Sequence, residues 1–101
     1  MASRLDLQTT LEEILGSRNV YYQPPSSIEM LYPAIVYSRN DILNTFADDT
    51  VYKQDTAYIV TVIDEDPDSE IVDKVSKLPK CRYNRHYESD NLNHDVFVLY
   101  Y

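Results

Sequence analysis

The chain has 101 residues, which fits a single domain spanning residues 1–101, and its 17 acidic against 9 basic side chains give a formal net charge of −8 at pH 7. This acidic balance disfavours binding to nucleic-acid phosphates or to anionic lipid by charge alone. Hydrophobic residues make up 44% of the chain and 10 residues are tyrosine, a composition that excludes general disorder. The single cysteine allows no disulfide within the chain, and no apolar run approaches the length of a membrane span. We therefore expect a soluble protein that is made in the cytosol.

Residues 3–16 have the pattern of an amphipathic helix. Ser3 can cap it, and Asp6 completes a capping box three residues later. The apolar stripe consists of Leu7, Leu11, Ile14 and Leu15. Gly16, the only glycine, stands where a helix commonly ends in a left-handed residue.

Five further segments have β character. The sequence predicts a short strand near Val20 followed by an extended Pro24-Pro25 connection, and strands at 32–39, 52–64, 81–88 and 94–101, with a turn at 89–93. The segment 52–64 is apolar on both faces near its middle, which is typical of a central strand. Together with a helix after residue 66, the predicted order is helix, three strands, helix, two strands. This order favours an α+β fold with a small, mostly antiparallel sheet packed by two helices.

The connection at residues 40–53 is longer than a hairpin needs, and Asn44, Asp48 and Asp49 are turn residues. We therefore expect most of it to be a loop. It also carries three large apolar residues, Ile42, Leu43 and Phe46. They either tuck under the loop against the core or form an arm that docks on a neighbouring subunit, with both aspartates facing water or a channel.

Five acids crowd the segment "DEDPDSE" at 64–70. Their alternation is similar to the start of a calcium-binding loop, but Ser69 and Val75 stand where that loop needs glycine and a bidentate glutamate. Asp66 followed by Pro67 instead predicts an N-cap and a first helical residue. An apolar stripe follows at Ile71, Val72, Val75 and Leu78, and lysines gather toward the other end. The acids are interpreted as the start of a helix.

No residue set predicts catalysis. In a regular strand, Cys81 and His86 are an odd number of residues apart and would lie on opposite faces, so without a bulge they could share neither a metal nor a reaction. Adding His94 still leaves a structural zinc site one ligand short. One glycine cannot build a phosphate-binding loop. We therefore expect a protein that is not an enzyme, with no cofactor and no bound metal.

Charge is ordered along the chain. Residues 40–70 hold nine acids and one base, whereas residues 71–88 hold five bases and two acids. A subunit that is acidic on one side and basic on another can associate head to tail, and such a contact can close into a ring. Lys74 and Lys77 are the candidate basic contacts, alongside Ile42, Leu43, Phe46, Asp48 and Asp49 in the connection. A solvated surface with chance clustering is the alternative.

Three stretches, "LYPAIVYSRND", "YIVTVIDEDPDSEIVDKVSKLPKC" and "DNLNHDVFVLYY", resemble small head–tail joining proteins of tailed bacteriophages. The resemblance covers roughly residues 28–101. The order of elements is also similar to that of tail terminator proteins, whose α+β subunits form a hexameric ring on the tail tube.

The resemblance implies a virion structural protein of the tail or neck, made in the host cytoplasm. Its implied partners are further copies of itself, the tail tube protein and a neck or connector protein, with DNA passing through the ring without specific binding. Another connector part, such as a stopper or head-completion protein, is the alternative role. From a different class, an acidic DNA mimic that inhibits a nucleic-acid-binding protein is also compatible with the net charge. The resemblance brings no catalytic residue with it.

Overall fold

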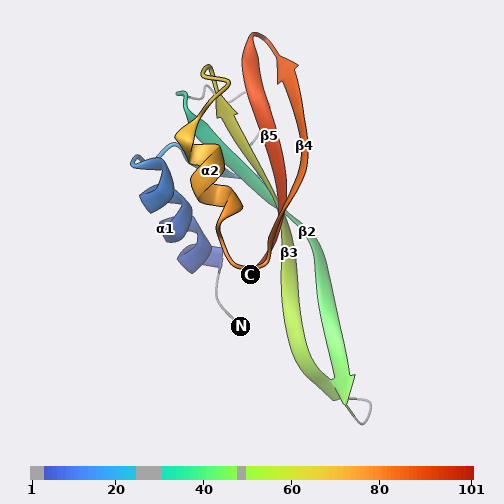
Figure 1. Cartoon of the computed structure of the whole chain (residues 1–101). Coiled ribbons are helices and arrows are strands. Elements are labelled where there is room, and N and C mark those ends of the chain that lie inside the picture. Colours follow the sequence, from blue (N-terminus) through green and yellow to red (C-terminus); the bar gives the residue numbers. More distant parts are fainter. Residues whose placement is uncertain (1–3, 25–30, 48–49) are drawn as a thin grey trace.

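The computed structural model describes residues 4–24, 31–47 and 50–101, with the backbone alone described over 41–47 and 50–55. These residues form an α+β domain in which a five-stranded mixed sheet carries two helices on one face (Figure 1). The elements are α1 (Arg4–Leu15), β1 (Val20–Tyr22), β2 (Ala34–Ala47), β3 (Thr50–Asp64), α2 (Glu70–Ser76), β4 (Cys81–Ser89) and β5 (Leu92–Tyr100). The predicted fold class and order of elements are therefore confirmed.

The sheet has the order β1-β2-β3-β5-β4. β1 pairs with β2 in parallel, and the three other pairings are antiparallel, as the sequence predicts for most of the sheet. β3 lies in the middle, which confirms the prediction from its two apolar faces.

Helix α1 packs through the predicted stripe. Leu7 and Leu11 are fully buried, and Ile14 and Leu15 pack partly buried against the same cluster. Gly16 ends the helix with φ of 77° and donates its N–H to the Glu12 carbonyl at 2.9 Å, as expected of a left-handed C-terminal residue. The predicted cap, Ser3, lies outside the described residues.

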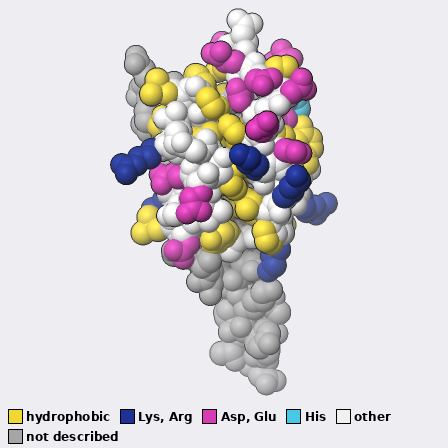
Figure 2. Space-filling model, turned by 60° about the vertical axis from the view of Figure 1, so that its left-hand side comes forward, with side chains coloured by type: hydrophobic (Ala, Val, Ile, Leu, Met, Phe, Trp, Pro, Cys, Tyr) yellow, Lys and Arg dark blue, Asp and Glu magenta, His cyan; other side chains and the backbone are white. Residues whose placement is uncertain are grey.

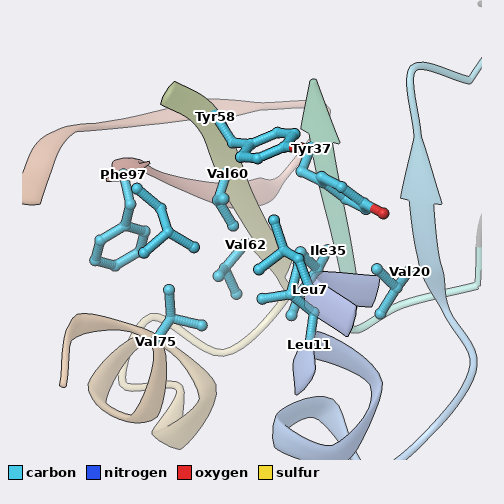
Figure 3. Close-up of a cluster of buried hydrophobic side chains, with 11 residues drawn as sticks. Leu7, Leu11, Val20, Ile35, Tyr37, Tyr58, Val60, Val62, Val75 and Phe97 are labelled. Carbon is cyan, nitrogen blue, oxygen red and sulfur yellow. The ribbon is translucent and has the colours of Figure 1, made fainter. Parts of the chain in front are cut away.

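The hydrophobic core lies between the two helices and one face of the sheet (Figure 3). Alternate residues of each strand point into it, because strand side chains alternate between faces. The sheet contributes Val20, Ile35, Tyr37, Tyr58, Val60, Val62, Phe97 and Leu99, and the helices contribute Leu7, Leu11 and Val75. Tyr37 is the largest fully buried side chain among the described residues, and its hydroxyl donates a hydrogen bond to the Gln8 side chain of α1.

The predicted start of the second helix is wrong. α2 begins at Glu70, and its N-cap is Ser69, whose side chain accepts a hydrogen bond from the Ile71 N–H at 3.3 Å. Asp64 and Asp66 instead accept the N–H groups of the residues two positions on, at 3.0 and 2.9 Å. Such local turns compete with helix for the backbone donors, which moves the cap three residues downstream.

The predicted loop at 40–53 is also wrong. β2 runs on to Ala47 and β3 begins at Thr50, so paired strands occupy most of this segment. The register shifts between Arg39 and Asp41, and beyond that irregularity the two strands leave the body of the sheet (Figure 1). We call residues 41–47 and 50–56 the outer hairpin.

The β4–β5 connection is a two-residue turn. Asp90 and Asn91 have φ of 53° and 63°, and Ser89 pairs directly with Leu92. Two successive left-handed residues are the pattern of a type I′ turn, whose twist matches that of antiparallel strands. The predicted turn at 89–93 is confirmed, in a tighter form.

The observed cap predicts the effect of substituting Ser69. Ser69→Ala removes the side-chain acceptor for the Ile71 N–H, so the free energy of unfolding should fall by about 1 kcal/mol. Urea denaturation followed by circular dichroism measures the change. Asp66→Ala serves as the matched control and should cost less, because it removes a turn contact at an exposed residue and leaves the cap in place.

Candidate interaction surface

The sheet face opposite the helices carries no helix in the described part of the chain (Figure 1). We call it the open sheet face. Three rows of directly paired residues cross it from β2 to β4: Ala34, Ile63, His94 and Tyr87; Val36, Thr61, Val96 and Arg85; and Ser38, Ile59, Val98 and Arg82. The rows are mostly apolar on the inner strands and end in an aromatic or cationic residue on β4.

The apolar residues of this face differ in exposure. Ala34, Ile63 and Val96 are buried, whereas Val36, Ile59 and Val98 are half-buried. The central strands thus present an apolar surface of moderate exposure. Apolar surface with a polar margin is typical of a protein contact site.

Strand β4 forms one edge of the sheet and is exposed over eight of its nine residues, Cys81 being half-buried. A register shift between Tyr83 and Arg85 inserts one extra residue, Asn84. Because of this bulge, Arg82 and Arg85 both pair with residues of the open sheet face, although a separation of three normally places residues on opposite faces. Both cations therefore lie along the same margin.

Aromatic contacts hold part of this margin in place. The Arg85 guanidinium lies 5.2 Å from the centre of the Tyr87 ring, and that ring stacks on His94 with 4.6 Å between centroids. The Nδ1 atom of His94 lies 3.1 Å from the Leu92 carbonyl. The far end of β4 thus carries an ordered cation–aromatic stack on the open sheet face.

On the helix-covered face, polar side chains join β4, β5 and the loop before α2. The Tyr83 hydroxyl donates to Asp95 at 2.9 Å, and His86 Nε2 lies 3.2 Å from the Asn93 side-chain oxygen. The Asn93 amide donates to the carbonyls of Asp64 and Glu65. Desolvation, followed by the hydrogen bond and charge of Asp95, raises the pKa of Tyr83. These hydrogen bonds fix the start of the acidic segment 64–70 to the sheet, so we interpret the polar residues that form them as structural.

The bulge also changes the relation between Cys81 and His86. Cys81 pairs with Leu99 and His86 pairs with Asp95, so both lie on the helix-covered face, contrary to the sequence expectation for a regular strand. Their partners stand four positions apart on β5, which corresponds to about 13 Å along the strand. That distance is too long for a shared metal or a proton transfer. Among the described residues, no three His, Cys, Asp or Glu side chains converge as metal ligands would.

An apolar groove of about 200 Å³ lies beside Cys81, at the C-terminal end of β5. It is lined by Leu78, Pro79, Lys80, Leu99, Tyr100 and Tyr101. Two main-chain hydrogen bonds involve its lining residues, from Tyr100 N–H to the Lys80 carbonyl and from Tyr101 N–H to the Thr56 carbonyl. The groove therefore lies where the outer hairpin joins the body.

The candidate contact residues from the sequence do not converge on one place. Lys74 and Lys77 are exposed on α2, on the helix-covered side, and Lys77 lies 3.7 Å from Asp73 in an exposed pair. Figure 2 shows this side, where cationic and acidic side chains intermingle with apolar ones. Ile42, Leu43 and Phe46 belong to β2 in the outer hairpin, and their side chains lie outside the description. Asp48 and Asp49 lie outside the described residues altogether.

Sequence reasoning missed the basic margin of β4. It grouped Arg82 and Arg85 with the lysines of the helix as one basic segment, whereas the fold places the lysines and the arginines on opposite sides of the sheet. The sequence did show two arginines within one predicted strand. It did not indicate the bulge that places them on the same face, because the strand contains no glycine.

Comparison of the chain with protein-family models and with curated proteins finds no match. No helix among the described residues is both long and apolar enough to cross a membrane.

The half-buried Cys81 gives a test of this part of the fold. Desolvation by burial raises the pKa of the Cys81 thiol, so the reactive thiolate is scarcer than in an exposed cysteine at the same pH. At pH 8, iodoacetamide should alkylate the folded protein more slowly than the protein unfolded in urea, and the folded rate should keep rising above the ordinary cysteine pKa. Equal rates in the two states would contradict the described packing of Cys81, and Cys81→Ser controls for labelling elsewhere.

Proposed function

We propose that the protein is a structural subunit of a tailed-bacteriophage virion, a tail terminator that assembles with copies of itself into a ring between tail tube and head connector. The outer hairpin is the observation that carries the proposal. Beyond Ala57, β3 pairs with β2 alone, and β1 reaches β2 only at residues 35–37. The ribbon therefore has no third strand in the described part of its own subunit.

A two-stranded ribbon in water is marginally stable, and a third strand or a packed helix is needed to hold it firmly. The molecule measures 51 Å along its longest axis and 25 and 23 Å across, because the hairpin extends away from the body (Figure 1). A neighbouring subunit within reach of the hairpin supplies the missing surface. An arm of this kind, reaching from one subunit to the next, suits a protein whose role is assembly.

The remaining surface supports the same role. The open sheet face and the exposed β4 edge lie on parts of the molecule that the hairpin does not touch. Contacts between unlike surfaces propagate from subunit to subunit and close into a ring when the rotation permits. The mechanism is then geometric: one side of the ring meets the tail tube, the other meets the connector, and a central opening admits DNA.

The net charge fits passage of DNA through such an opening. A lining that shares the charge of −8 per subunit repels the phosphate backbone, so the duplex is not held on its way through. Acidic residues at 64–70 are mostly exposed, and acidic side chains gather at the end of the molecule away from the hairpin (Figure 2).

Removing the outer hairpin should separate assembly from folding. A variant in which Asn-Gly replaces residues 43–55 closes β2 and β3 by a type I′ turn just beyond the directly paired Ile42 and Thr56. We expect this variant to keep the circular dichroism of a folded domain and to remain a monomer in native mass spectrometry. The intact chain should form a closed ring visible by electron microscopy.

The matched control places the same dipeptide elsewhere. Replacing Asp90-Asn91 by Asn-Gly keeps the observed left-handed turn between β4 and β5 and should leave the ring unchanged. Rings formed equally well by the shortened variant would show that the hairpin has no part in assembly and would remove the support for this proposal.

Deleting the gene tests the role within the virion. A terminator stops growth of the tube, so its loss should give tails of irregular length together with heads that remain unjoined in electron micrographs. Tails of uniform length beside heads that lose their DNA would identify the stopper role instead. Normal infectious particles would rule out both roles.

A further inference from the structure

We propose that the outer edge of β4 receives the outer hairpin of a neighbouring copy as an added strand, so that subunits join head to tail by extending one sheet with the next. This inference rests on the proposed ring. It assigns the two surfaces that meet: the hairpin as donor and β4 as acceptor.

The acceptor edge is long and open. Within the described residues, β4 pairs only with β5, so the alternate N–H and C=O groups on its other side have no strand partner. Eight of its nine residues are exposed. An exposed edge of this length is a template for another strand.

The charge of β4 determines which kind of strand can pair with its outer edge. Arg82 and Arg85 lie on β4 itself, and the one acidic residue of that strand is Glu88. Two β4 edges laid against each other would bring like charges together, which disfavours a symmetric pairing of β4 with β4. The same charges favour an acidic strand and so favour a contact between unlike surfaces.

Each strand of the outer hairpin carries one acidic residue. Asp41 lies on its β2 strand, which has no basic residue, and Asp55 lies on its β3 strand together with Lys53. Over residues 41–47 and 50–55, no strand of the described chain pairs with the outer side of the hairpin, because β1 ends its pairing at Tyr37 and β5 begins its pairing at Ala57. The donor therefore offers free main-chain groups together with negative charge.

The dimensions agree. Seven residues on each hairpin strand span about 23 Å, and the nine residues of β4 span about 30 Å. Donor and acceptor belong to different parts of the sheet: the hairpin continues β2 and β3, whereas β4 is the edge strand beyond β5. The hairpin also points away from its own β4, so the partner edge comes from another copy (Figure 1).

The position of the two arginines adds a geometric constraint. The bulge at Asn84 places Arg82 and Arg85 along the open sheet face, so both cations act on an added strand from the same side of the sheet. A strand added here would also extend the open sheet face from one subunit into the next.

Charge reversal and its rescue test the contact. The double variant Arg82→Glu with Arg85→Glu should raise the apparent dissociation constant of the ring by about tenfold at low salt, because the attraction of the β4 edge for an acidic strand becomes a repulsion. The variant Asp41→Arg with Asp55→Arg changes one aspartate on each hairpin strand and should do the same whichever strand is added, and combining all four changes should restore assembly. The comparison variant, Lys74→Glu with Lys77→Glu, makes the same charge change on α2 and should leave the ring intact.

Hydrogen exchange gives a readout that is independent of charge. In the ring, the outward-facing amides of β4 should exchange more slowly than in the monomeric variant that lacks residues 43–55, because the added strand takes up their N–H groups. Rings with unprotected β4 amides, or rings broken by the α2 reversal and unaffected by the β4 reversal, would overturn this inference and leave the proposed ring standing. A wild-type chain that stays monomeric up to millimolar concentration would overturn the ring and this inference together.

Discussion

The central position of β3 is the constraint on which the rest of the structure depends. Over residues 57–64 this strand is bonded to β5 on one side and, up to Ile63, to β2 on the other, and most of its side chains are apolar toward both faces, Thr61 and Asp64 being the polar ones. Val60 and Val62 meet the helices, while Ile59 and Ile63 meet the open sheet face. From Thr50 to Asp55 the same strand pairs with β2 alone in the described part of the chain. One continuous strand thus fixes the core, the open face and the direction in which the hairpin leaves the body.

The sequence predicts those elements whose burial pattern is regular. The spacing of Leu7, Leu11, Ile14 and Leu15 places all four on one face of a helix, and that face is the one packed against the core. Gly16 adopts the left-handed conformation that the end of the helix requires. The alternation in 52–64 likewise predicts a central strand, since no other arrangement buries both of its faces. In each case the hydrophobic effect and the local backbone preference agree, which is why the pattern is readable without the structure.

The errors arise where two local solutions compete. Asp66 with Pro67 and Ser69 with Glu70 are both acceptable helix starts. The side chains of Asp64 and Asp66 accept local hydrogen bonds that form turns, and the helix begins after Ser69. Asn44 and the following aspartates favour a loop, yet pairing between β2 and β3 continues past them. The bulge at Asn84 has no signal in residue type, although it decides which face Arg82 and Arg85 occupy. The candidate contact surface was therefore only partly predictable: its charges can be read from the sequence, but their alignment depends on strand register.

The net charge places a last condition on how copies of this chain can meet. Each subunit carries a net charge of −8, so two subunits repel each other even when their centres are tens of ångströms apart. The attraction between hairpin aspartates and the β4 arginines, in contrast, acts over a few ångströms. At 0.1 M salt the screening length is about 10 Å, which removes most of the first effect and little of the second. Very low salt restores the repulsion, and salt near 1 M, with a screening length of about 3 Å, weakens the contact itself. Assembly through β4 therefore has an optimum at intermediate ionic strength. A ring held by the apolar open face alone would instead grow steadily more stable with added salt, because no attractive charge contact is lost.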